Sequence, residues 1–428
     1  MKIHSSDSPE TTGASGESGP TDPSDRIVAL DALRGFALLG ILVINIWLFG
    51  MPSVSALNPA LYGDFTGANY LAWAISHVFF EQKFVTLFTF MFGAGIVLFL
   101  ESKAQNGGSG RKLHFSRTFW LLVIGLAHAY LLWYGDILVL YALCGFLVVW
   151  VWRWQPTRQF VLGVGMFAIP SVLYAFLGVS YLSLSADGRA EFETEVLAAF
   201  GAEFSPEREL EIYQAGWLEQ MTHRVPVLLE FHTLGFIFEW FWMLGGLMII
   251  GMALYNWGVL SDERSTRFYK RVLVGVGGVG LALVLVGVWI RELFAWETIP
   301  VLTLAFQFNY WGSLLLAIGY LAGVMILCRW LRGGIVVTAL AAVGRTAFTN
   351  YLLQTLIATT IFYGHGLGLF GQFTRVELLG VVVVIWAIQI PLSMWWVQRF
   401  RFGPVEWLWR TLTYRKRQPM GKETKGGS

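Results

Sequence analysis

The sequence predicts an all-α protein that crosses a membrane about ten times, and three observations support this prediction. First, 56% of the 428 residues are hydrophobic and only 14% are charged, whereas about a quarter of the residues in soluble proteins are charged. Second, apolar runs long enough to span a bilayer recur along the chain. Third, Lys and Arg gather in every second connection between these runs, as in cytoplasmic loops. We therefore expect both termini in the cytoplasm.

Ten apolar runs have the length of a membrane span. They are 27–49, 82–100, 115–134, 136–153, 159–182, 227–256, 271–290, 308–328, 344–363 and 376–398. The basic connections follow the second, fourth, sixth, eighth and tenth runs. An even number of crossings with alternating basic connections fits a chain whose two ends lie on the inner side.

The remaining segments are polar, and they divide the chain into five parts. These are a disordered cytoplasmic tail over 1–26, an N-terminal bundle over 27–182, an acidic insert over 183–226, a C-terminal bundle over 227–411 and a basic cytoplasmic tail over 412–428. Composition identifies the first tail, because Ser, Gly, Pro and acidic residues cannot bury a core. The insert carries nine acidic residues and three arginines. Ser205 followed by Pro206 predicts a helix start within it, on the outer surface.

The first run contains more polar groups than a simple anchor requires. Asp31 and Arg34 are three residues apart and share a helix face, and Gly35 allows another backbone to approach closely. Asn45 lies about 16 Å beyond Arg34, three turns along the same side. A helix with polar groups at two depths on one face lines a cavity. Arg34 then either forms a structural pair with Asp31 or binds an anion.

A second group of polar residues surrounds a tight outer turn at Tyr134 and Gly135. His128 precedes this turn, and Asp136 begins the returning helix. On adjacent antiparallel helices the two side chains can meet, and the carboxylate would orient and charge the imidazole. The pair is either a hydrogen-bonded clasp for the hairpin or a site of proton transfer. His77 and Glu81, four residues apart nearer the outer surface, are interpreted as structural.

Two later spans also contain polar residues. Glu239 lies near the bilayer midplane, where a carboxylate is protonated, paired or in contact with water. Arg345, Asn350 and Gln354 line the inner half of the ninth run, and such a stripe either joins helices or lines a pocket. We predict no metal site, because no His cluster has ligand spacing.

One glycine motif has the spacing of a dinucleotide-binding site but lies in a different structural context. Gly275, Gly277 and Gly280 form a literal GxGxxG, but they lie inside an apolar helix. A dinucleotide site needs a preceding strand and a βαβ unit, so we interpret these glycines as points of close helix packing. No feature of the sequence indicates a nucleic-acid partner. The expected surroundings are the lipid bilayer, and an oligomer is compatible with the sequence.

With these residues identified, the chain resembles the YeiB-like family of bacterial membrane proteins, a domain of unknown function. The matching stretches are RIVALDALRGFALLGILVIN at 26–45, FTFMFGAGIVLFL at 88–100, IGLAHAYLLWYGDILVLYAL at 124–143, GRTAFTNYLLQT at 344–355 and FGPVEWLWRTLTY at 402–414. They cover almost the whole chain in order. The resemblance implies a multi-pass protein of the bacterial cytoplasmic (inner) membrane.

The stretch LDALRGFALLGILVIN is also similar to the first span of membrane-bound acyltransferases, which include heparan-alpha-glucosaminide N-acetyltransferase. This resemblance implies an acyl-CoA donor from the cytoplasm and an acceptor, often a sugar, toward the far side. The same resemblance assigns four residues to the acyltransferase site: Asp31, Arg34, Gly35 and Asn45. The lysosomal enzyme has a catalytic His shortly after the Asn. This chain has none between Asn45 and Ala68, so His128, or failing that His77, is the substitute base.

Three functional hypotheses follow. In the favoured one, Arg34, Arg117 and Arg345 hold the phosphates of acyl-CoA, because guanidinium matches phosphate oxygens. His128 and Asp136 activate a sugar, amine or lipid-linked hydroxyl, and Asn45 stabilises the oxyanion. In the second, the protein is a transporter or flippase with a relay through Glu239, His128 and Asp136, although signals for broken helices are weak. In the third, the acidic insert binds partners as a scaffold or sensor.

Overall fold

A computed structural model describes residues 28–105, 110–199 and 205–422 of this protein. Within these ranges the secondary structure is helical, and the one β-type contact is an isolated bridge between Phe400 and Gly421. The prediction of an all-α fold is therefore confirmed. The predicted tail over 1–26 and the last residues of the basic tail, 423–428, lie outside the described residues.

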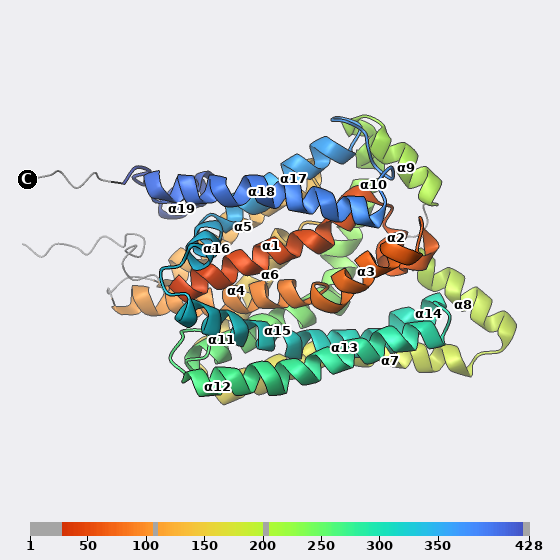
Figure 1. Ribbon diagram of the computed structural model, residues 1–428, viewed down its shortest axis with the longest axis horizontal. Coiled ribbons are helices and arrows are strands. Elements are labelled where there is room, and N and C mark those ends of the chain that lie inside the picture. The colour runs from red at the N-terminus through yellow and green to blue at the C-terminus, as the bar shows by residue number, and fades with distance from the viewer. Residues whose placement is uncertain (1–27, 106–109, 200–204, 423–428) are drawn as a thin grey trace, which may run out of the picture.

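The helices of the first half run mostly parallel to the long axis of the molecule (Figure 1). They are α1 (Val28–Gly50), α2 (Val54–Leu57), η2 (Pro59–Leu61), α3 (Gly67–Phe79), α4 (Lys83–Gln105), α5 (Gly110–Leu131), α6 (Leu138–Val148), η3 (Val149–Val151), α7 (Pro156–Ser183) and α8 (Ala186–Ala199).

The second half continues the same bundle, with three π-helical stretches inside longer helices. The elements are α9 (Pro206–Gln214), α10 (Trp217–Glu230), η4 (Phe231–Gly245), α11 (Gly246–Asn256), α12 (Thr266–Arg271), η5 (Val272–Val276), α13 (Gly277–Leu293), α14 (Thr298–Pro300), η6 (Val301–Ala305), α15 (Phe306–Trp330), α16 (Ile335–Arg345), α17 (Ala347–Phe362), α18 (Arg375–Arg399) and α19 (Pro404–Tyr414).

Every predicted run coincides with helix, but fewer helices meet the length and hydropathy of a membrane span. Among the described residues seven do so, or eight if the bent pair α16 and α17 forms one span. Two of the predicted runs fall on helices outside this set. One is α5, and the other is α6, which is shorter than a full span. The structure thus supports a membrane protein, and the total of ten crossings stays a prediction.

The basic connections lie at one end of the bundle, the end at which α12, α16 and α19 are found (Figure 1, left). Following the predicted orientation, we call this the inner end and the opposite end, with α9, the outer end. Helix α1 begins at the inner end, and α18 finishes there. The described chain therefore starts and ends on the same side of the bundle.

Helix α1 packs tightly against α16. A Cβ atom on Gly35 would lie 1.9 Å from the carbonyl oxygen of Leu340, and one on Gly344 would lie 1.8 Å from the carbonyl oxygen of Asp31. Because no side chain fits in either place, both positions require glycine. The expected close approach at Gly35 is confirmed, and Gly344 on α16 is its partner.

The ninth predicted run is not one straight helix. It contains a bend of 80° between α16 and α17, at Thr346. Glu406 of α19 accepts hydrogen bonds at the start of α17 from the backbone N–H groups of Phe348 (2.7 Å) and Thr349 (3.2 Å), and also from the Thr349 hydroxyl. The carboxylate thus caps backbone donors that the break leaves free.

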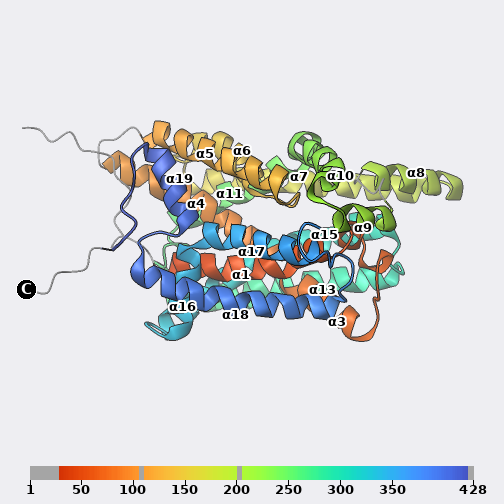
Figure 2. The same ribbon diagram turned by 90° about the horizontal axis from the view of Figure 1, so that it is seen from above.

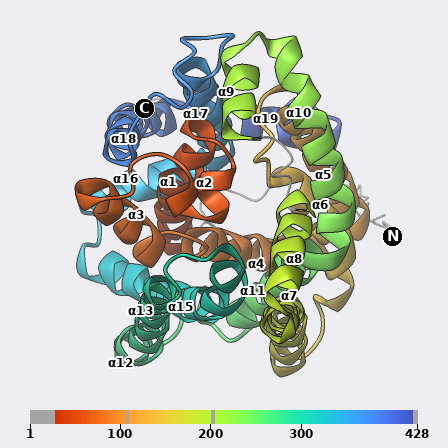
Figure 3. The same ribbon diagram turned by 90° about the vertical axis from the view of Figure 1, so that its right-hand side faces the viewer.

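The acidic insert lies over the outer end of the bundle (Figure 3). The expected helix start is confirmed, because the Ser205 hydroxyl accepts from the backbone N–H of Arg208 at 3.3 Å at the start of α9. Glu209 accepts from both the backbone N–H and the hydroxyl of Ser53 at 2.9 Å. The Trp217 indole donates to the carbonyl of Leu131 at 2.8 Å. Helices α9 and α10 therefore form a cap that is hydrogen-bonded to the bundle.

Candidate functional site

Four cationic side chains from four helices meet near the inner end. We call Arg34 (α1), Lys103 (α4), Arg117 (α5) and Arg410 (α19) the inner cation cluster. Helix α19 crosses the bundle axis beside α5 (Figure 2), where the Trp409 indole donates to the carbonyl of Arg117 at 2.8 Å. The sequence predicted Arg34 and Arg117 at this site, and the structure brings both of them there.

Aromatic rings hold these cations in place. The guanidinium of Arg117 lies 4.5 Å from the ring centre of Trp409 and 5.2 Å from that of Phe99. Lys103 Nζ lies 5.4 Å from the ring of Tyr414. A cation over an aromatic face is attracted by the ring quadrupole. The rings therefore fix the positions of these side chains without neutralising their positive charge.

The cluster carries an excess of positive charge. Arg34 pairs with Asp31 at 3.0 Å, but neither Arg117 nor Arg410 forms an ion pair with a carboxylate among the described residues. Burial, and in addition the positive charge of Arg34, lowers the pKa of Arg410. Guanidinium groups held close together in this way form a site for a phosphate or another multivalent anion.

Arg345 is the last residue of α16 and follows Gly344, which packs against the backbone of Asp31. Burial and, in addition, the positive charge of Arg345 lower the pKa of Lys422. The buried Nε atom of Arg345 has no hydrogen-bond partner in the described part of the chain. The prediction placed Arg345 and Asn350 on one stripe of a straight helix, and the bend at Thr346 removes Arg345 from that stripe.

The predicted contact between His128 and Asp136 forms, deep within the protein. His128 Nδ1 and Asp136 Oδ1 are 2.7 Å apart. The other carboxylate oxygen accepts from the backbone N–H of Val139 at 2.8 Å, at the start of α6. Since an ionised carboxylate only accepts, the proton lies on His128 Nδ1. In the neutral imidazole, His128 Nε2 then carries the lone pair.

That lone pair faces a hydroxyl from a distant part of the chain. Thr355 Oγ1 of α17 lies 2.9 Å from His128 Nε2. Thr355, His128 and Asp136 are 1%, 2% and 1% exposed. A hydroxyl, an imidazole and a carboxylate are thereby connected by two hydrogen bonds, in the order found in nucleophilic triads.

The stripe on α17 has two faces. Asn350 donates to the Ser393 hydroxyl at 2.8 Å, and Gln354 donates to Gln389 of α18 at 3.0 Å. This face therefore joins two helices, as one of the two interpretations proposed. The neighbouring face, about 100° around the helix, carries Thr355 and, one turn earlier, Tyr351.

Tyr351 is the aromatic neighbour of the imidazole. Its ring centre lies 5.2 Å from that of His128. Its buried hydroxyl lies beside the Ile137 backbone but makes no hydrogen bond of normal geometry among the described residues. A buried hydroxyl without a partner usually indicates a missing ligand or water.

Two predicted residues lie outside these clusters. Asn45, in the outer half of α1, is half-buried, and its side chain makes no hydrogen bond within the described ranges. Glu239 lies in the π-helical stretch η4, where its carboxylate accepts from the Tyr174 hydroxyl at 3.1 Å. The midplane carboxylate therefore has a partner, which the sequence did not indicate.

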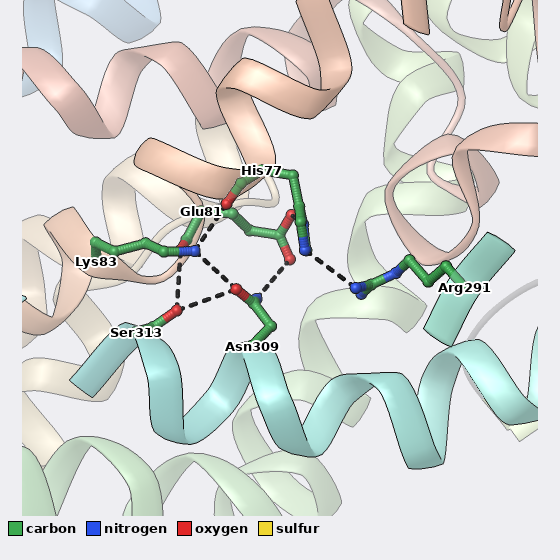
Figure 4. A network of polar contacts seen from close by, with 6 residues as sticks. All are labelled: His77, Glu81, Lys83, Arg291, Asn309 and Ser313. Atoms are coloured by element: carbon green, nitrogen blue, oxygen red, sulfur yellow. Dashed lines mark hydrogen bonds and ion pairs between the residues drawn. The ribbon is translucent and has the colours of Figure 1, made fainter. Parts of the chain in front are cut away.

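His77 and Glu81 belong to a larger network at the break between α3 and α4 (Figure 4). His77 Nδ1 lies 2.5 Å from Glu81, and Arg291 Nη1 lies 3.0 Å from His77 Nε2. Lys83 Nζ donates to the carbonyl of His77 and to the Asn309 side chain, both at 2.7 Å.

This network satisfies the carbonyls that the break releases. Besides the bond from Lys83 to the carbonyl of His77, the Tyr320 hydroxyl donates to the carbonyl of Phe79 at 3.0 Å, and Ser313 donates to that of Glu81 at 3.3 Å. The positive charge of Lys83 also faces the negative end of the α3 dipole. The structural interpretation of His77 and Glu81 is therefore consistent with these contacts.

Sequence reasoning missed three residues that complete the two main clusters. Arg410 and Lys103 join the inner cation cluster, and Thr355 joins His128. Two of the stretches that carry the family resemblance contain members of this set: FGPVEWLWRTLTY contains Arg410 and the cap Glu406, and GRTAFTNYLLQT ends at Thr355. Thr355 lies 227 residues from His128, so no local spacing could indicate the contact.

Comparison with known proteins identifies the family of this chain. The model of a family described as "Protein of unknown function (DUF418)" matches residues 254–416. The uncharacterized protein YeiB of Escherichia coli (strain K12) is 35% identical over 94% of this chain and 99% of its own length. The uncharacterized protein YxaH of Bacillus subtilis (strain 168) is 29% identical over 95% and 98%, respectively. The chain therefore belongs to the YeiB-like family of membrane proteins.

Proposed function

We propose that this protein is an integral-membrane acyltransferase of the bacterial cytoplasmic membrane. It would take an acyl group from a cytoplasmic acyl-CoA and pass it to a sugar, an amine or a lipid-linked hydroxyl at or beyond the membrane. The observation that supports this most directly is that a cation cluster and a buried His–Asp pair are connected by one helix. The first turn of α17 is capped by Glu406, which lies on α19 together with Arg410, and α17 carries Thr355 beside His128.

The inner cation cluster is suited to the donor. Arg117 and Arg410 lack carboxylate partners in the described ranges, so their guanidinium N–H groups can bind phosphate oxygens bidentately. From Ala347 to Thr355 the helix rises about 12 Å. A donor whose phosphates lie at the inner end would therefore extend along α17 toward the imidazole.

The His–Asp pair is suited to the transfer. His128 Nε2, which contacts the Thr355 hydroxyl, would take a proton from an attacking hydroxyl or amine, and Asp136 would stabilise the imidazolium that forms. In this proposal Asn45 approaches the reacting carbonyl from α1 and donates to the oxyanion. Asp31 orients Arg34 toward the donor phosphates.

Acyl-CoA binding tests the donor half of the proposal. Purified protein in detergent is mixed with acetyl-CoA, octanoyl-CoA or palmitoyl-CoA and examined by native mass spectrometry. Binding should weaken at least about tenfold in Arg410→Ala and Arg34→Ala, because each removes a charge-assisted hydrogen bond to phosphate. Arg399→Ala, at the same end but outside the cluster, is the matched control. If none of the three donors binds to the wild type, the acyltransferase proposal is wrong.

A second candidate function is a transporter or flippase. The broken helix α3–α4, the bend at Thr346 and the π-helical stretch around Glu239 favour it, because transporters bind substrates at interrupted helices. The relay would use Glu239, His128 and Asp136. Uptake into proteoliposomes that is abolished by Glu239→Gln, with acyl-CoA binding unchanged, would support transport over acyl transfer.

A further inference from the structure

We propose that Thr355 is the nucleophile that carries the acyl group as a covalent ester between donor and acceptor. This inference rests on the proposed acyltransferase function and deepens it, because it divides the reaction into two steps. Its basis is the hydrogen-bonded series from Thr355 Oγ1 through His128 to Asp136, with lengths of 2.9 and 2.7 Å.

The geometry directs the proton of the Thr355 hydroxyl toward His128 Nε2. Asp136 accepts from Nδ1–H, so Nε2 carries the lone pair and the Thr355 hydroxyl is the donor to it. The alternative acceptor for that proton, the carbonyl of Tyr351, is farther away, at 3.4 Å. The hydroxyl is therefore polarised toward the base before any substrate binds, which is how a weak nucleophile is activated.

The surroundings fit a covalent intermediate. Thr355 and His128 are almost completely buried, and exclusion of water protects an ester from hydrolysis. The unpartnered hydroxyl of Tyr351, one turn earlier on α17, is a donor for the oxyanion. Because the site is closed in this conformation, α17 must move relative to α5 and α6 to admit the thioester.

The first step forms one bond and breaks one bond. Thr355 Oγ1 attacks the thioester carbonyl carbon, and its proton passes to His128 Nε2. The tetrahedral intermediate collapses with cleavage of the C–S bond, and the imidazolium protonates the leaving thiolate to give free CoA. The product is a threonyl ester, with no change in oxidation state.

The second step reverses the roles of the same groups. An acceptor hydroxyl or amine attacks the ester carbonyl, and His128 takes its proton. The C–O bond to Thr355 then breaks, and the imidazolium returns the proton to Oγ1. The residue is regenerated, and the acyl group is on the acceptor. Donor and acceptor therefore do not need to occupy the site together, which suits a donor and an acceptor on opposite faces of a membrane.

The test is a single-turnover experiment without acceptor. Wild-type protein and octanoyl-CoA are quenched in acid over a series of times, and both free CoA and the intact protein mass are measured. We expect a burst of one CoA per protein, an added octanoyl mass on the peptide that contains Thr355, and its removal by alkaline but not by neutral hydroxylamine, because an oxygen ester is less reactive than a thioester. His128→Gln should slow the burst by roughly 10²–10⁴.

Two substitutions at position 355 control for folding. Thr355→Val has the same shape without the hydroxyl and should lose the adduct completely, while octanoyl-CoA binding stays within about twofold of wild type. Thr355→Ser should retain the adduct. Wild-type protein that binds octanoyl-CoA but forms no adduct, or an adduct that persists in Thr355→Val, would overturn this inference and leave the donor site intact. Absence of octanoyl-CoA binding would count against the proposed function itself.

Discussion

At the scale of single residues, the protein contains both satisfied and unsatisfied buried polar groups. Tyr141 and Tyr351 illustrate the two kinds. The hydroxyl of Tyr141 lies 2.7 Å from that of Thr89, whereas that of Tyr351 lacks a partner of normal geometry in the described ranges. A satisfied group contributes to stability, while an unsatisfied one is retained at a cost.

Tyr351→Phe should therefore affect the chemistry and not the fold. We expect an unchanged or slightly higher melting temperature, because no protein hydrogen bond is lost, and a burst of CoA release slowed by about 10²-fold, because one oxyanion donor is removed. Differential scanning fluorimetry and the acid-quench assay measure the two effects. Tyr141→Phe is the control and should lower stability without slowing the burst. An unchanged burst in Tyr351→Phe would exclude its hydroxyl from the reaction.

Glu209 makes the stability of the outer cap depend on pH. Burial raises the pKa of this carboxyl to about 7, and the hydrogen bonds from Ser53 oppose the shift only in part. Between pH 4.5 and 7 the folded state therefore binds more protons at Glu209 than the unfolded state does. This contribution to the free energy of unfolding is full below pH 4.5 and is lost as pH rises to 7, at a cost of up to about 3 kcal/mol.

Glu209→Gln isolates this effect. The amide cannot ionise, so the free energy of unfolding of the variant should decline less than that of wild type between pH 5 and 7.5. Urea unfolding in mild detergent at a series of pH values gives both curves. Identical slopes in the two proteins would show that the carboxyl is already ionised in the fold.

At the scale of helices, the two close contacts and the two breaks decide how the spans are arranged. The sequence signalled Gly35 and the hairpin around His128, because a small residue inside a polar stretch and an eight-residue spacing across a tight turn are local patterns. It did not signal the bend at Thr346, since no Pro lies there and Gly344 is used for packing. The sequence did not indicate the contact between Thr355 and His128 either, because this contact depends on how α5, α6 and α17 pack together.

Gly344→Ala should separate α1 from α16. The added methyl group would overlap the carbonyl oxygen of Asp31, so one helix must shift, at a cost of roughly 1–3 kcal/mol. Gly278→Ala on α13, where an added Cβ meets nothing within 4 Å, is the control and should change stability by less than about 1 kcal/mol. Thermal unfolding of both variants in one detergent provides the comparison, and equal melting temperatures would contradict the packing argument.

Lys83→Met should weaken the break between α3 and α4. It leaves the carbonyl of His77 without its side-chain donor and removes one of the two donors to the side-chain oxygen of Asn309, the other being the Ser313 hydroxyl at 3.2 Å, for a loss of roughly 1–3 kcal/mol. Hydrogen exchange should increase at the end of α3 and the start of α4. Lys112→Met, at an exposed position on α5, serves as the reference. Unaltered protection at the break would mean that the other members of the network are sufficient to hold it.

At the scale of the whole molecule, the charge pattern and the helix order give one orientation. Composition and periodicity predicted helix over every run, because apolar stretches in a bilayer must satisfy their backbone internally. The number of crossings depends on α5 and α6, whose lengths and polar ends local patterns do not resolve.

Cysteine labelling tests the orientation directly. Glu191→Cys in α8 should react with a membrane-impermeant maleimide in intact cells, whereas Lys112→Cys at the start of α5 should react only after permeabilisation. Both positions are exposed, and the two native cysteines are buried. The opposite labelling pattern would reverse the positive-inside assignment and place the cation cluster outside.

The cap at the start of α17 has a mechanical consequence. Glu406 and Arg410 are one turn apart on α19, so the side chain that grips α17 and a side chain suited to an anion move as one rigid body. A ligand that draws Arg410 inward must also pull the first turn of α17. In the proposed reaction, a movement of α19 on donor binding would therefore be transmitted to α17, the helix that carries Thr355.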